Sequence, residues 1–258
     1  MITSDKNPKI QQVRALIDHA KERKTSSSFV IEGVRLVGEA ILAQWELQLI
    51  LISDNLSPHG REIVAAARKQ AVNVEEIPPQ MMAKLGDTTT PQGILAIASL
   101  PVPKLPERLN FTLICDAIRD PGNLGTILRT AQAAGVQALV LSPGTTDPFA
   151  PKVVRAGMGA HFHLPIFQFN WPEIQAVCQH SHLNVYLASA GSSTYYWQVN
   201  LIEPTAIIIG GEAEGASQEA KKLASQTISI PMPGQSESLN AAISAGILLF
   251  ETVRQRSQ

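Results

Sequence analysis

Polar side chains gather at points of the sequence where an apolar segment ends, and such points are candidate ligand sites. Ser238 and Asn240 lie at the start of the last long helical segment, where backbone N–H groups have no intrahelical partner. Asn123 and Arg129 lie in an earlier helical segment. Helical side chains lean toward the amino terminus, so Arg129 is expected to pass over Gly125 toward Asn123. The simpler alternative, in which Arg119 or Arg129 only pairs with a nearby carboxylate, stays open at this point; the candidate partners are Asp116, Asp120 and Glu212.

Three apolar segments are expected to be the strands that position these polar side chains. They span residues 111–115, 206–211 and 228–230. Continuous apolar runs are typical of strands buried on both faces of a mostly parallel sheet. In such sheets ligands bind beyond the carboxyl ends of the strands. The sequence therefore predicts an α/β domain with its site at one edge of the sheet.

The last helical segment follows a loop that is rich in proline, glycine and serine. Ser236 or Ser238 is predicted to cap the helix. One apolar face recurs at steps of three and four residues and is predicted to point into the core, and it comprises Leu239, Ile243, Gly246, Ile247 and Phe250.

Three stretches of the chain resemble the three motifs of the SpoU/TrmH family of RNA ribose 2'-O-methyltransferases, which belongs to the SPOUT class. They are residues 120–131 (DPGNLGTILRTA), 209–215 (IGGEAEG) and 230–251. Residues 7–9, 29–35 (FVIEGVR) and 90–96 (TPQGILA) are similar to the amino-terminal substrate-binding region of many members. The likeness thus covers nearly the whole chain. Gly157 stands where the family often has serine, so a role for a hydroxyl there does not carry over.

The resemblance implies a fold, an activity and a set of site residues. The expected fold is a small, ribosomal-protein-like α/β RNA-binding domain followed by a mostly parallel α/β domain with a trefoil knot, paired as a homodimer. The expected reaction transfers a methyl group from S-adenosyl-L-methionine to a ribose 2'-hydroxyl of RNA. The implied catalytic residues are Asn123, Arg129, Glu212, Ser238 and Asn240. The implied cofactor-binding residues are Ala188, Gly210, Gly211, Ile230, Met232 and Leu239.

The resemblance also implies a role for the arginine. Arg129 is expected to hold the phosphate next to the target ribose, while Asn123 and Asn240 orient the hydroxyl or the guanidinium. Because the pKa of a guanidinium lies above about 12, arginine is a poor base. The proton is expected to leave with the help of phosphate, water or Glu212.

Charge and composition limit where RNA could bind. The chain has 258 residues and a formal net charge of −1, so an RNA surface must be a local patch. Residues 6–24 contain six basic and two acidic residues, which fits either a phosphate-contacting surface or an ordinary solvated helix face. The resemblance favours the first. The predicted RNA-binding residues are Lys6, Lys9, Arg14, Arg23, Arg35 and Arg155.

The chain is expected to form two domains joined by a stiff linker. Alternating strand and helix signals predict a compact α/β unit at residues 1–100. Residues 101–108 include prolines at 101, 103 and 106, which neither a helix nor a central strand tolerates. Residues 109–258 are expected to form the methyltransferase domain.

Several other classes of protein are disfavoured. The two cysteines are expected to be buried free thiols, and His161 and His163 lack metal-ligand partners at suitable spacing, so no metal is expected. No G-x-G-x-x-G fingerprint follows a first strand, which argues against a nicotinamide or flavin enzyme. No apolar run resembles a signal peptide or a membrane span, which favours the cytoplasm.

Two related functions compete with ribosomal RNA methylation. One is methylation of transfer RNA, and the amino-terminal likeness favours ribosomal RNA over it. The other is a catalytically inactive RNA-binding protein of the same fold, and the joint presence of the five implied catalytic residues argues against it.

Overall fold

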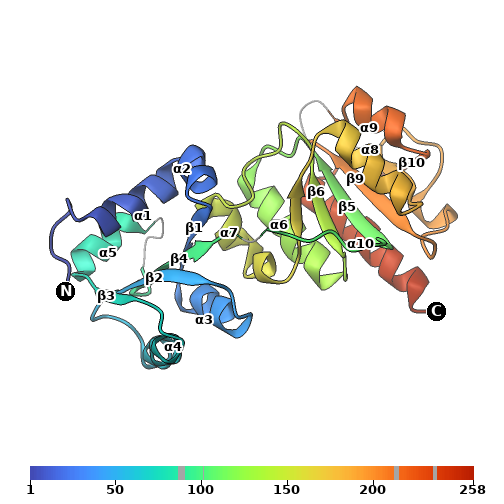
Figure 1. The fold of residues 1–258 in the computed structure, drawn as a ribbon. Helices are drawn as coiled ribbons and strands as arrows, with labels where there is room; N and C mark the ends of the chain where they lie inside the picture. The colour runs from blue at the N-terminus through green and yellow to red at the C-terminus, as the bar shows by residue number, and fades with distance from the viewer. Residues whose placement is uncertain (87–90, 101, 212–214, 235–236) are drawn as a thin grey trace. The chain divides into compact units, whose positions relative to one another are not determined.

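The computed structural model describes residues 1–86, 91–100, 102–211, 215–234 and 237–258. The chain divides into two compact units (Figure 1). Unit 1 comprises Met1–Val102 and Phe149–Phe162, and unit 2 comprises Pro103–Pro148 and His163–Gln258. The segment 149–162 therefore belongs to unit 1, although the sequence analysis placed it in the second domain. As independently folding domains, residues 1–100 and 109–258 stay a prediction.

Unit 1 is built on a four-stranded mixed sheet of order β1-β4-β2-β3. Its strands are β1 (Ser28–Glu32), β2 (Leu47–Ile52), β3 (Val74–Glu76) and β4 (Ile94–Ser99). Its helices are α1 (Pro8–Asp18), α2 (Ala20–Thr25), α3 (Val34–Leu42), α4 (Pro58–Lys69), α5 (Pro79–Leu85), α7 (Pro151–Gly157) and the 3-10 helix η1 (Ala160–Phe162). β4 is antiparallel to both β1 and β2, whereas β2 and β3 are parallel.

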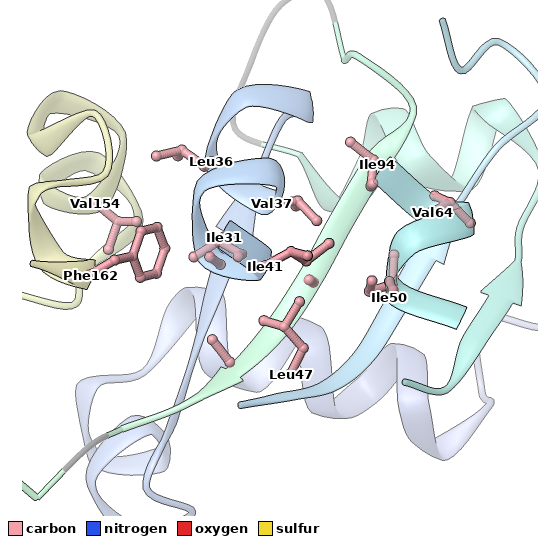
Figure 2. Packing of buried hydrophobic residues seen from close by; sticks show 14 of the residues in the cluster. Ile31, Leu36, Val37, Ile41, Leu47, Ile50, Val64, Ile94, Val154 and Phe162 are labelled. Carbon is pink, nitrogen blue, oxygen red and sulfur yellow. The ribbon is translucent and has the colours of Figure 1, made fainter. Parts of the chain in front are cut away.

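Helices cover both faces of the unit 1 sheet. Successive strand residues point to opposite faces, so Phe29 and Ile31 join one buried cluster and Val30 joins the other. The first cluster contains residues of α3 and α4 together with Val154 of α7 and Phe162 of η1 (Figure 2). The second contains residues of α1 and α5. Burial of an apolar side chain of this size contributes roughly 1.5–3 kcal/mol, so α7 and η1 help to hold unit 1 together.

Unit 2 is built on a six-stranded parallel sheet of order β10-β8-β9-β5-β6-β7. Its strands are β5 (Phe111–Asp116), β6 (Ala138–Leu141), β7 (Ile166–Gln168), β8 (Asn184–Ala188), β9 (Thr205–Gly210) and β10 (Gln226–Ile228). Its helices are α6 (Pro121–Ala133), α8 (Trp171–His180), α9 (Gln218–Leu223), α10 (Ala241–Arg256) and the 3-10 helix η2 (Tyr196–Gln198). The predicted parallel α/β architecture is confirmed.

The two faces of the unit 2 sheet carry different helices (Figure 1). α8 and α9 bury apolar residues such as Ile174 and Ala220 against one face. α6 and α10 pack against each other, and α10 contacts β9. The pairing of Asp116 with Gly210 and of Ile228 with Ala188 brings the carboxyl ends of neighbouring strands to one edge.

The prediction for the core-facing side of α10 is wrong. Ile243 is 55% exposed and Phe250 is 49% exposed, whereas the buried residues are Ala241, Ala242, Ala245, Leu248, Leu249, Glu251 and Thr252. The helix carries apolar residues on most sides, so periodicity alone could not select the face. The small alanines lie inward, where they let the helix backbone approach its neighbours α6 and β9 closely.

None of the helices in the described part of the chain has the length and apolar character that a membrane span requires.

Candidate active site

A cavity of about 880 Å³ lies at the carboxyl ends of the unit 2 strands. It is lined by the residues that follow or end β8, β9 and β10 and by the amino-terminal ends of α6 and α10. The structure brings these predicted cofactor-binding residues into its lining: Ala188, Gly210, Gly211, Ile230, Met232 and Leu239. Asn123, Ser238 and Asn240 from the predicted catalytic set line the same cavity.

Two glycines at the end of β9 sit against other backbone segments. A Cβ added at Gly210 would lie 2.8 Å from the Ala216 nitrogen, and one added at Gly211 would lie 2.7 Å from the Ala117 oxygen. Real Cβ atoms do not approach backbone atoms so closely, so a side chain at either position would push the loops apart. Glycine at these two positions therefore permits the close packing of backbone segments where β9 ends.

The buried carboxylate of Asp116 ties three loops together near the cavity. Its Oδ1 accepts a hydrogen bond from the Ser142 hydroxyl at 3.0 Å, and its Oδ2 accepts one from the Ser217 backbone N–H at 2.7 Å. These bonds join the end of β5 to the end of β6 and to the start of α9. Sequence reasoning considered Asp116 only as a partner for an arginine. An acidic residue directly after an apolar strand was the signal for this structural role.

The starts of α6 and α10 meet through two asparagine side chains. Asn240 caps α10, because its Oδ1 accepts hydrogen bonds from the N–H groups of Ala242 (2.9 Å) and Ile243 (3.3 Å). Its Nδ2 donates to the Asn123 Oδ1 at 3.0 Å. Since the capping bonds fix which end of the Asn240 amide is the oxygen, they also fix the donor that faces Asn123.

Capping residues set the geometry of both helix starts. Asp120 caps α6 by accepting a hydrogen bond from the Asn123 N–H at 2.7 Å, with Pro121 in the first turn. The cap of α10 is Asn240 rather than the predicted Ser238, while the other predicted cap, Ser236, lies outside the described residues. Two helix amino termini thus border the same cavity, an arrangement that favours negative charge.

The other two predicted catalytic residues are not placed in the lining. Arg129 is exposed on α6, and within the described residues it makes no hydrogen bond or ion pair, so it does not pair with Asp116 or Asp120. The alternative pairing with Glu212 stays a prediction. Glu212 lies outside the described residues.

Sequence reasoning missed several residues that line the cavity. They are Asp120, Leu187, Ser189, Ala190, Ile209, Gly215, Ala216, Lys221, Thr227, Ile228, Ala241 and Ser244. Half of them lie at or directly after the end of a strand, where the predicted site could have been extended by a residue or two. Lys221 belongs to α9 and carried no motif signal, so only the fold could identify it.

One predicted RNA-binding residue is corrected by the structure. Arg23 is only 5% exposed, and its Nη1 donates hydrogen bonds to the carbonyl oxygens of Leu16 (2.6 Å) and Ile17 (3.1 Å). It neutralises the carbonyl groups at the end of α1, where a cation is favoured. The charge pattern could not reveal this, because the helical segment is interrupted at His19 and α2 turns Arg23 back toward α1.

The remaining predicted RNA-binding residues differ in their surroundings. Lys9 pairs with Glu75, and this hydrogen bond lowers the pKa of the Glu75 carboxyl group. Arg14 pairs with Asp5 at 2.7 Å. The side chains of Lys6 and Arg35 are exposed, and Arg155 is half-buried in α7.

The cysteines do not contribute to the cavity. Cys115 and Cys178 are buried free thiols, and burial raises the pKa of Cys178 to about 11. His161 is buried in η1 beside the Phe149 ring. Within the described residues no group of histidine, cysteine and carboxylate side chains could hold a metal ion.

Comparison with known proteins identifies both parts of the chain. The SpoU rRNA Methylase family matches residues 110–250, and the MRM3-like substrate binding domain matches residues 7–96. The 23S rRNA (guanosine(2553)-2'-O)-methyltransferase RlmP of Bacillus subtilis (strain 168) is 33% identical over 96% of this chain and 97% of its own length. The 23S rRNA (uridine(2479)-2'-O)-methyltransferase of Streptomyces viridochromogenes is 30% identical over 99% of this chain and 92% of its own length.

Two similar solved structures contain AdoMet. The SpoU methyltransferase AviRb from Streptomyces viridochromogenes in complex with AdoMet has a TM-score of 0.88 and 28% identity, covering 97% of this chain and 99% of that one. The AdoMet-bound rRNA methyltransferase from Sinorhizobium meliloti has a TM-score of 0.88 and 31% identity, covering 98% of this chain and 97% of that one.

Proposed function

The chain belongs to the SpoU rRNA methylase family, and from this premise we propose that it transfers a methyl group from S-adenosyl-L-methionine to a ribose 2'-hydroxyl of ribosomal RNA. The observation that carries the proposal is the cavity at the strand ends of unit 2, which gathers Asn123, Ser238 and Asn240 with the six residues expected to bind the cofactor. Two relatives that are named as 23S rRNA 2'-O-methyltransferases align along nearly the whole chain. The AdoMet complex of AviRb does so as well.

The cavity fits S-adenosyl-L-methionine on physical grounds. Its volume of about 880 Å³ is typical of small-molecule sites. Apolar strand ends such as Ile209 and Ile228 exclude water from a purine ring, while adjacent backbone groups can form hydrogen bonds to the ring edge. Gly210 and Gly211 keep this part of the wall free of side chains. Ala188, Ile230, Met232 and Leu239 would complete the binding surface.

When bound, the cofactor supplies an electrophilic methyl group on a sulfonium. The protein's part is then to hold the ribose in line with it and to place charge, and such orientation can contribute roughly 7–11 kcal/mol. Asn240 fixes Asn123 through the 3.0 Å hydrogen bond between their amides, so Asn240 is a positioning residue and Asn123 presents its amide to the substrate. The two helix amino termini beside them favour a phosphate group at this end of the cavity.

Arg129 follows Asn123 along α6, and we assign it to the RNA phosphate next to the target ribose. Its guanidinium is exposed and has no ion pair within the described residues, so it is free to form two parallel hydrogen bonds with a phosphate. Since a guanidinium is a poor base, the proton leaves by way of phosphate, water or Glu212.

A methylation assay tests the proposed function. The purified protein with radiolabelled S-adenosyl-L-methionine should label ribosomal RNA from cells that lack the gene, and 2'-O-methyl mapping of RNA from cells with and without the gene should show one site that differs. Label found only in transfer RNA would show that transfer RNA, and not ribosomal RNA, is the substrate. Binding of RNA without label would favour the inactive RNA-binding alternative.

The homodimer and the trefoil knot implied by family membership belong to the same proposal. Support for the dimer comes from α10, whose outward face presents Ile243 and Phe250, and from Trp197, which is 46% exposed. Exposed apolar side chains of this size suit an interface between two copies.

Light scattering tests the dimer. Phe250→Glu should shift the mass toward 27.8 kDa, whereas Leu42→Glu, which changes an exposed leucine in unit 1, should leave the mass of the wild type unchanged. A wild-type mass of a monomer would overturn this part of the proposal. Ala245→Arg is not a suitable test, because Ala245 is fully buried within its own chain.

A further inference from the structure

Lys221 is the one cationic side chain among the described residues that line the cavity. It lies on α9, is exposed to solvent, and forms no ion pair with any residue in the described part of the chain. Its neighbour Lys222 lines a different cavity, together with Trp171 and Cys178 of unit 2 and other residues of α8 and α9. A lysine without an ionic partner at the wall of a ligand site is a candidate for binding an anionic group of that ligand.

The described residues of the cavity lining include one side chain of each charge. Asp120 is the one carboxylate among the described lining residues and caps α6, whereas Lys221 lies within α9. S-adenosyl-L-methionine carries a single anionic group, the α-carboxylate of its methionine moiety. A carboxylate in a partly enclosed site gains more from an ammonium partner than it would in bulk water.

We propose that Lys221 binds the α-carboxylate of S-adenosyl-L-methionine and thereby selects cofactors that carry an intact amino acid. This inference rests on the proposed function of the cavity. It adds to that function a residue outside the three motifs, on an element that the sequence analysis did not connect with the site.

The position of α9 separates this role from the chemistry on RNA. α9 packs with α8 on one face of the sheet, while Asn123 and Asn240 come from α6 and α10, which pack against each other. Lys221 therefore contributes to cofactor affinity when no RNA is present. It also makes no distinction between S-adenosyl-L-methionine and S-adenosyl-L-homocysteine, because both carry the carboxylate.

Calorimetry with three ligands in the absence of RNA tests the inference. The ligands are S-adenosyl-L-methionine, S-adenosyl-L-homocysteine and decarboxylated S-adenosyl-L-methionine, which lacks only the carboxylate. Lys221→Met should weaken binding of the first two by about tenfold, as expected for one hydrogen bond to a charged group, and leave binding of the decarboxylated ligand unchanged. Lys221→Arg should keep most of the affinity for the first two.

Lys222→Met is the matched control, since it removes the same charge from the same helix at a position outside the cavity lining. It should change none of the three affinities. If Lys221→Met bound S-adenosyl-L-methionine as tightly as the wild type, or lost the same factor for the decarboxylated ligand, the carboxylate assignment would be wrong while the cavity remained the cofactor site. If the wild type bound none of the ligands, the proposed function would fail first, and this inference with it.

Discussion

The candidate site residues of unit 2 and the candidate RNA-binding residues of unit 1 were predicted from different sequence patterns, and their surroundings in the structure differ. In unit 2 the selection followed the ends of apolar strands, and Asn123, Ser238 and Asn240 line one cavity. In unit 1 the selection followed local charge. There Arg23 is buried as a cap of α1, and Lys9 and Arg14 pair with acidic residues of their own unit.

The difference has a simple physical origin. The carboxyl ends of neighbouring parallel strands must lie side by side at one edge of a sheet, so residues far apart in sequence converge there without further information. A run of basic residues carries no such constraint. Each long cationic side chain reaches the nearest carboxylate or carbonyl group that the fold supplies, and only the remainder can meet a nucleic acid. Four predictions probe this comparison.

The largest effect is expected at Arg129 in unit 2. Arg129→Ala should lower methyl transfer by about a thousandfold, because the transition state loses a charge-assisted phosphate contact, while calorimetry should find little change in cofactor affinity. Arg129→Lys should also fail, since an ammonium cannot form the two parallel hydrogen bonds of a guanidinium. Lys222→Ala is the control for loss of a surface cation. Near-normal turnover of either Arg129 variant would contradict the phosphate assignment.

A smaller effect is expected at the amide pair. Asn240→Asp keeps an acceptor for the N–H groups of Ala242 and Ile243 but cannot donate to Asn123, so the helix cap should survive while the Asn123 side chain loses its orientation. Turnover should fall by about a hundredfold with an almost unchanged melting temperature. Asn240→Ala should lose turnover and, in addition, about 1 kcal/mol of stability through the missing cap. Full activity of Asn240→Asp would exclude the positioning role.

Asp116 should affect stability before it affects chemistry. Asp116→Ala removes the acceptor of the Ser217 N–H and one of the two acceptors of the Ser142 hydroxyl in a buried site, and the free energy of unfolding should fall by about 2 kcal/mol. Denaturant titration measures the change, and Asp54→Ala, an exposed carboxylate in unit 1, is the control and should change it by less than about 0.5 kcal/mol. Equal changes in the free energy of unfolding for the two variants would contradict the role of Asp116 in joining the loops.

The smallest effects separate two basic residues of unit 1. Arg23→Gln should lower stability by about 1.5 kcal/mol through the lost hydrogen bonds to the end of α1, with no change in the salt dependence of RNA binding. Lys6→Gln should leave stability unchanged and reduce the slope of log affinity against log salt by about 1, if it meets a phosphate. If Arg23→Gln reduced the salt dependence of RNA binding without lowering stability, Arg23 would again be a candidate RNA contact.

Substitutions are better tests of unit 1 than its removal. A fragment without residues 1–100 would keep Val154 and Phe162 but lose the sheet and helices against which they are buried. Its loss of RNA binding could then reflect exposed apolar surface rather than missing contacts. This follows from the assignment of Phe149–Phe162 to unit 1, which no local pattern of the sequence indicated.

The sequence by itself determined the parallel architecture of unit 2, the strand ends at which a ligand site forms, and the family. Each depends on local order, because apolar runs define buried strands and the motifs occur in a fixed sequence along the chain. The tertiary structure decided which side of α10 is buried, since that helix is apolar on most sides and only close approach to α6 and β9 selects the alanines. It also decided that Arg23 caps a helix, that Asp116 ties loops together and that Lys221 borders the cavity. Those roles depend on distances between segments that lie far apart along the chain, and residue type and spacing do not contain that information.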